Sequence, residues 1–87
     1  MSLTWPRDGA GVRANSRVKI QASASDDEGV QHVRFYVAGT LRCTDWSAPY
    51  ACGWRTAKKG GYRITIQAVA RDTDGNEASD SITVVTV

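Results

Sequence analysis

Two cysteines are the residues whose chemistry the sequence displays most sharply. Cys43 and Cys52 stand on either side of the segment 45–50, Asp-Trp-Ser-Ala-Pro-Tyr, which is typical of a turn-containing connection. Thiols at this spacing allow a disulfide, two buried free thiols, or a metal or redox pair. The third use is disfavoured, because the spacing is not Cys-x-x-Cys and no histidine lies close by in the sequence.

A second candidate site is acidic. The run Asp72-x-Asp74-Gly75-Asn76 resembles the opening of a calcium loop, because Ca²⁺ takes several oxygen ligands. An EF-hand is excluded, because no Glu stands at the twelfth position and no helical pattern flanks the run. The same residues are also a good β-turn sequence that needs no ion, and this is the favoured interpretation. The alternative is a calcium site at one end of the fold, with ligands from Asp26, Asp72, Asp74 and Asn76.

A third candidate site is aromatic. Trp46 stands in a polar connection between Asp45 and Ser47, and is expected to be an exposed ring. Exposed rings stack on sugar faces or anchor protein partners, although packing within the loop is the commoner role. If a ligand binds here, we expect Trp46, Tyr50 and Arg42 to contact it.

The remaining residues argue against an enzyme. The single histidine, His32, is expected to be an exposed surface residue beside Arg34, and no serine lies in Gly-x-Ser-x-Gly. Gly60-Gly61 lacks the context of a phosphate loop. A tightly packed domain of 87 residues also has little room for a catalytic pocket. We therefore expect no catalytic residue, and no cofactor apart from the calcium alternative.

Length and composition limit what can position these residues. The 87 residues are enough for one domain with a modest core, spanning residues 1–87. A net charge of +2 does not by itself imply nucleic acid as a partner, and no apolar run approaches the roughly 20 residues of a membrane span. The chain does not open with a leader sequence, so we expect a piece of a larger protein.

Alternation of apolar and polar residues with period two predicts strands. Val18, Ile20, Ala22 and Ala24 share one face, as do Val33, Phe35 and Val37, then Tyr62, Ile64, Ile66, Ala68 and Ala70, and finally Ile82 and Val84. Ala38-Gly39 indicates a tight hairpin, and Trp54 is expected in the core. Strands are predicted at 3–5, 17–24, 31–37, 40–44, 50–55, 61–71 and 78–86. Seven short strands separated by turns favour a sandwich of two antiparallel sheets.

Several of these segments resemble bacterial immunoglobulin-like domains. The resemblance covers roughly residues 3–87 and is carried by Pro6-x-Asp8-Gly9-Ala10, the stretch from Ala24 to Val30, Val33-x-Phe35-Tyr36-Val37-x-Gly39, Ala48-Pro49-Tyr50 with Trp54-x-Thr56, and Ala68-x-Ala70-x-Asp72-x-x-Gly75-Asn76. It implies a Greek-key, immunoglobulin-like sandwich. It also implies a local disulfide between Cys43 and Cys52, and hence an oxidising compartment.

The resemblance also sets the expectation for function. Domains of this family are appended to secreted proteases, glycoside hydrolases and surface adhesins. We therefore expect a secreted or cell-surface, monomeric accessory module that acts as a spacer, with weak adhesion at most. Its partners would be neighbouring domains of the same polypeptide, and a polysaccharide or cell-surface protein is the further partner to consider. The alternative function is a carbohydrate or cell-wall binding module that uses its exposed loop aromatics.

Overall fold

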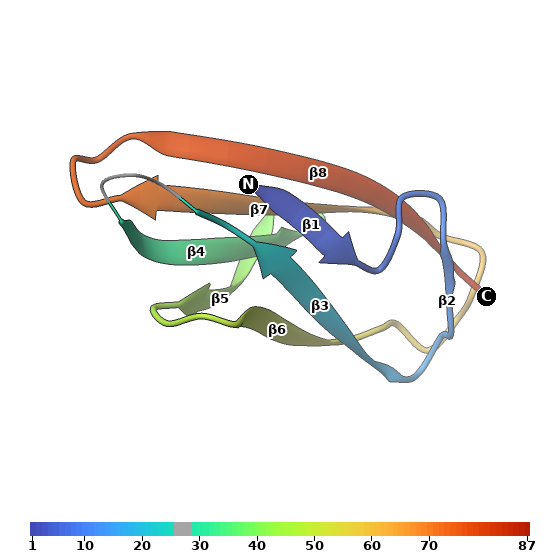
Figure 1. Ribbon diagram of the computed structural model, residues 1–87. Coiled ribbons are helices and arrows are strands. Elements are labelled where there is room, and N and C mark those ends of the chain that lie inside the picture. The colour runs from blue at the N-terminus through green and yellow to red at the C-terminus, as the bar shows by residue number, and fades with distance from the viewer. Residues whose placement is uncertain (26–28) are drawn as a thin grey trace.

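In the computed structural model, which describes residues 1–25 and 29–87, the alternating segments form β-strands (Figure 1). These residues contain no helix, and so none that could cross a membrane. The strands are β1 (Ser2–Trp5), β2 (Gly11–Val12), β3 (Arg17–Ser23), β4 (Val30–Val37), β5 (Thr40–Asp45), β6 (Tyr50–Arg55), β7 (Arg63–Asp72) and β8 (Glu77–Thr86).

All seven predicted strands are confirmed, and the structure adds an eighth. This strand, β2, has 2 residues and pairs parallel to β8, so the predicted sandwich of about seven antiparallel strands is confirmed with one short parallel addition. Main-chain hydrogen bonds hold it, from Val85 N–H to the Ala10 carbonyl and from Val87 N–H to the Val12 carbonyl. A strand this short has no period-two pattern to detect, because alternation needs at least four residues.

The strands divide into two sheets that pack face to face. One sheet has the order β1-β3-β6, and the other has the order β2-β8-β7-β4-β5. β3 pairs with β6 and β4 pairs with β7, so neighbouring strands are often distant in the sequence, as in a Greek key. The chain therefore changes sheet between β5 and β6, which is where segment 45–50 lies.

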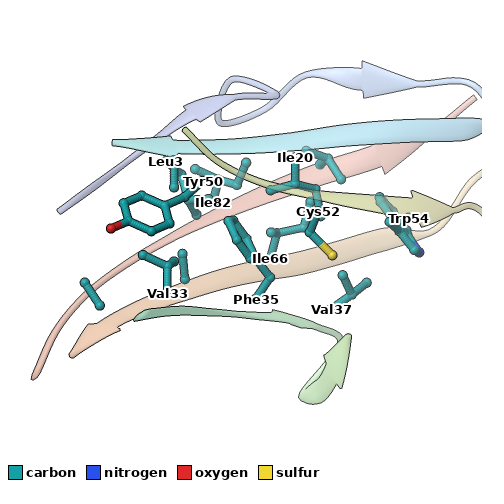
Figure 2. Packing of buried hydrophobic residues seen from close by; sticks show 14 of the residues in the cluster. Leu3, Ile20, Val33, Phe35, Val37, Tyr50, Cys52, Trp54, Ile66 and Ile82 are labelled. Carbon is teal, nitrogen blue, oxygen red and sulfur yellow. The ribbon is translucent and has the colours of Figure 1, made fainter. Parts of the chain in front are cut away.

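The core lies between the two sheets and is built from the inward positions of the strands (Figure 2). The predicted burial of Ile20, Val33, Phe35, Ile66, Ala68 and Val84, all 0% exposed, is confirmed, as is that of Trp54 at 5%. Tyr62 is a correction, because its ring is 54% exposed. β6 ends at Arg55 and β7 begins only at Arg63, so Tyr62 lies at the end of the sandwich, where no strand covers it.

The β4–β5 hairpin contains a change of register that decides which side chains face the core. Ala38 and Gly39 form the predicted two-residue turn with φ values of 51° and 80°, as a type I′ turn requires. Tyr36 pairs with Leu41, but Phe35 pairs with Cys43, which leaves Arg42 as the extra residue of a β-bulge. A shift of one residue moves every following side chain to the opposite face. Cys43 therefore lies on the core side of β5, opposite Phe35.

Two carboxylates bridge the sheets at the two open sides of the sandwich. On one side, Asp45 of β5 accepts a hydrogen bond from Ala51 N–H of β6 at 3.0 Å. On the other side, Asp80 of β8 accepts one from Leu3 N–H of β1 at 2.8 Å. β1 and β6 are the edge strands of the smaller sheet, so each carboxylate satisfies an edge N–H that could otherwise pair with another chain.

Candidate functional site

The disulfide between Cys43 and Cys52 joins the two sheets at the crossing from β5 to β6. Its Cα atoms are 5.8 Å apart, and neither cysteine of the chain is free. The Cys52 side chain is 2% exposed and lies in the core (Figure 2). The bond reinforces the link that Asp45 makes between the same two strands. The predicted pairing is confirmed, and its role is structural.

Trp46 forms an exposed aromatic surface directly after β5. Its side chain is 63% exposed, as predicted, and one face of its ring covers His32 of β4. The two ring centroids are 4.6 Å apart with an angle of 49° between the planes. Because Val33 pairs with Asp45, the next position on each strand brings His32 opposite Trp46. The indole therefore packs on His32 with one face, and its other face is exposed to solvent.

The loop that carries Trp46 is fixed at both ends. Asp45 accepts hydrogen bonds from Ser47 N–H at 3.2 Å and from Ala51 N–H at 3.0 Å. The disulfide also closes this loop, because Cys43 precedes Asp45 and Cys52 follows Ala51. A ring held in this way loses little conformational freedom when it binds a ligand, which lowers the entropic cost of binding.

Polar and cationic groups continue this surface along β4. The guanidinium of Arg34 lies 5.9 Å from the ring centroid of Tyr36 and pairs with the Glu77 carboxylate. Beneath the surface, Nδ1 of His32 and Nε of Arg34 are buried without a hydrogen-bond partner. Buried polar atoms usually have such a partner, and among residues 1–25 and 29–87 these two side-chain atoms of β4 are the ones that lack it.

The structure separates the residues that were predicted to contact a ligand together. Tyr50 is a correction, because it is 7% exposed and its side chain lies among the core residues (Figure 2). It is the first residue of β6 and pairs with Ala22, which places it on the inner face of the smaller sheet. Arg42 is exposed in the bulge of β5, and the residue that touches Trp46 is His32.

His32 itself was predicted to be exposed, and this expectation is wrong. Its side chain does lie on the outer face of β4, but only 8% of it is exposed because Trp46 covers it. The sequence did not predict this contact, because the contact depends on the bulge at Arg42, which the sequence pattern does not reveal. Extending the register of the hairpin turn without it would pair His32 with Asp45.

The acidic turn between β7 and β8 is held by its own hydrogen bonds. Oδ1 of Asp72 accepts from the N–H groups of Asp74 at 2.9 Å and of Asn76 at 2.8 Å, and Oδ2 accepts from the Asn76 side-chain amide at 3.1 Å. Burial by itself raises the pKa of Asp72, but the hydrogen bonds from Asn76, Asp74 and Gly75 outweigh it and lower that pKa.

These contacts are what the β-turn interpretation requires. Within residues 1–25 and 29–87, no group of three or more His, Cys, Asp or Glu side chains could hold a metal ion. Asp26 of the predicted calcium set lies outside the described residues, so calcium binding stays a prediction.

Comparison with known proteins agrees with this geometry. The family model described as "Bacterial Ig domain" matches residues 1–84. The chain belongs to the bacterial Ig domain family. Among solved structures, this Ig domain is similar to the fibronectin(III)-like modules of Clostridium thermocellum CbhA, with 30% identity and a TM-score of 0.86. The match covers 98% of this chain and 93% of that one. No curated protein matches.

The first prediction concerns the disulfide of the Ig domain. Reduction should lower the free energy of unfolding by about 2.6 kcal/mol, the loop-closure entropy for a separation of this size. The midpoint of thermal unfolding should fall by roughly 10–20 °C. Thermal unfolding with and without reductant measures this, and intact mass confirms the change of redox state. The double variant Cys43→Ala/Cys52→Ala is the control and should not respond to reductant. An oxidised wild-type domain no more stable than this variant would contradict a structural role.

The second prediction concerns Asp72. Its pKa is lower in the folded domain than the 3.8 of an ordinary Asp, so its contribution to stability is present above pH 3.8 and is lost as pH falls through the folded pKa. The variant Asp72→Asn should therefore unfold more easily than wild type at neutral pH, and the difference should shrink in acid. Urea unfolding across a pH series measures both curves.

The matched control for this experiment is Asp74→Asn, since Asp74 supports the turn through its main-chain N–H. It should lose little stability. A gap between wild type and Asp72→Asn that stays constant from neutral to acid pH would show that the charge of Asp72 is not what holds the turn. The same unfolding experiment, done once with EDTA and once with calcium, tests the prediction of calcium binding. Equal stability of the domain under the two conditions would exclude a calcium site at this turn.

Proposed function

We propose that this Ig domain is a non-catalytic accessory module of an extracellular bacterial protein, and that it holds neighbouring parts of the same polypeptide at a fixed separation. The observation that carries the proposal is the elongated shape of the sandwich, with the C-terminus at one end and the N-terminus part-way towards the other (Figure 1). Family membership supports a non-catalytic role, and the disulfide supports an oxidising, secreted or cell-surface location. We further propose that the domain is monomeric.

The placement of the termini follows from their neighbours. Met1 lines the same hollow as Ala24, Ala70 and Ala78, and Figure 1 shows the N-terminus set back from the β7–β8 turn. Val87 contacts Gly60 and Gly11 at the other end of β8 (Figure 1). β7 has 10 residues, so it runs for about 30 Å between the two ends of the sandwich. The dimensions of 42 × 19 × 18 Å describe a rod that the chain leaves at one end (Figure 1).

A spacer must also resist bending and opening between its sheets. The disulfide and Asp45 close one side of the sandwich, and Asp80 closes the other. These three links do not share a partner atom, so loss of one leaves the others in place. The separation between the termini then depends on the packed core rather than on a single hinge.

The third prediction tests the spacer role with donor and acceptor dyes at the two termini. The oxidised domain should give a single, narrow distribution of distances by single-molecule energy transfer, because a packed core has one arrangement. The urea-unfolded chain is the internal control and should give a broad distribution. A broad distribution of distances, or one with several peaks, in the folded domain would contradict the proposal of a rigid spacer.

A second candidate function is carbohydrate binding through Trp46. The observation that favours it is a largely exposed indole held over His32, in a loop fixed by Asp45 and the disulfide. The free face of such a ring suits the apolar face of a sugar, and Arg42 on the same edge strand supplies hydrogen-bond donors. In this proposal, Tyr50 has no part.

The fourth prediction follows from that surface. Binding to cell-wall glycan in a pull-down should weaken about tenfold in Trp46→Ala, because the stacking face is lost. Trp46→Phe should retain most of the binding. Leu41→Ala is the matched control, since Leu41 is also exposed on β5 but lies beyond the bulge. Binding unaffected by Trp46→Ala, or absent in wild type, would exclude this function while leaving the spacer proposal intact.

A further inference from the structure

A shallow hollow of about 540 Å³ lies at the C-terminal end of the domain, away from Trp46. It is formed by the β6–β7 connection and the first residues of β7, and its lining residues are Ala57, Lys58, Lys59, Tyr62, Arg63 and Ile64. It is an open surface depression rather than an enclosed cavity, so a ligand bound there would keep one side in solvent. The Tyr62 ring, 54% exposed, supplies most of its aromatic surface, and Ile64 is half-buried beneath.

The charged side chains that line this hollow are all positive. Lys58, Lys59 and Arg63 are exposed, and none of them pairs with a carboxylate of residues 1–25 or 29–87, where the ion pair that forms is Arg34–Glu77. Three unpaired cations around one small apolar surface attract anions. The ligand that complements them must carry several negative charges.

Hydrogen bonds to buried residues hold the main chain beneath the hollow in place. Tyr62 N–H donates to the hydroxyl of the buried Thr86 at 3.0 Å, and Thr86 N–H donates to the Tyr62 carbonyl at 2.9 Å. At the other end of the connection, Thr56 is buried, and its hydroxyl donates to the Arg13 carbonyl at 2.8 Å. The Tyr62 ring is therefore exposed on an anchored backbone, which lowers the entropic cost of using it.

The size of the hollow separates two kinds of anionic partner. A stable protein interface buries about 1,200–2,000 Å² around a cluster of apolar anchors, whereas this hollow offers one aromatic ring. A pyranose ring matches that single ring, because its C–H face packs on an aromatic face. Carboxylates attached to the sugar would then reach the surrounding cations as charge-assisted hydrogen bonds.

We propose that this hollow binds an acidic polysaccharide made of uronate sugars. Tyr62 stacks on one sugar ring, and Lys58, Lys59 and Arg63 bind the carboxylates of that sugar and its neighbours. The site is independent of Trp46 and of the spacer role, so the proposal does not rest on either of them.

The fifth prediction uses polygalacturonate as the probe and the same polymer, fully methyl-esterified, as its uncharged counterpart. Calorimetry should detect wild-type binding to the first polymer and at least tenfold weaker binding to the second, and the binding should weaken as salt is raised. Tyr62→Ala and the double variant Lys58→Gln/Lys59→Gln should each bind about tenfold less tightly. Tyr62→Phe should bind as wild type does, because it keeps the stacking ring.

Two controls separate this site from general attraction to a basic protein. Arg42→Gln removes one positive charge on β5, and Trp46→Ala removes the other exposed aromatic surface, and neither should change binding. Thermal unfolding of each variant verifies the fold, and the lysine variant remains informative if Tyr62→Ala is destabilised. Equal binding to both polymers, no wild-type binding, or a loss in Arg42→Gln equal to that in the lysine variant would each overturn the proposal.

Discussion

The one-residue bulge at Arg42 is the constraint on which the arrangement of this Ig domain depends. Without it, Arg42 would face Phe35 in the core, and Cys43 would point to solvent. With it, Cys43 faces inward and reaches Cys52 across the gap between the sheets. The same shift brings Trp46 over His32. A single extra residue on an edge strand thus allows both the cross-link that closes the sandwich and the support of its exposed indole.

Closure of the sandwich combines a covalent link with two carboxylates, and each has a different physical role. The disulfide acts mainly on the unfolded chain, by reducing the conformations that it can adopt. Asp45 and Asp80 act on the folded state, because each binds an N–H of an edge strand in the smaller sheet. An edge with a charged group directed at it is a poor template for pairing with another chain. The two carboxylates therefore protect both edges of the smaller sheet against pairing with a further strand.

Much of the fold could be predicted because period-two alternation is a local signal. Every long strand, the hairpin turn and the inward sets around Phe35 and Ile66 were visible in the sequence. What could not be predicted depends on contacts between distant segments. The burial of Tyr50 follows from its pairing with β3, and the exposure of Tyr62 from where the opposing sheet ends. The burial of His32 depends on the bulge, and the bulge cannot be recognised from the types of residue around Arg42.

The two exposed aromatic surfaces lie too far apart to act as one site. His32, under Trp46, pairs with Arg71 near one end of β7, whereas Tyr62 immediately precedes the other end. Arg63 and Arg71 are eight positions apart along the extended strand, which corresponds to about 26 Å. Changes at such a distance act additively, so each surface can be removed without altering the other.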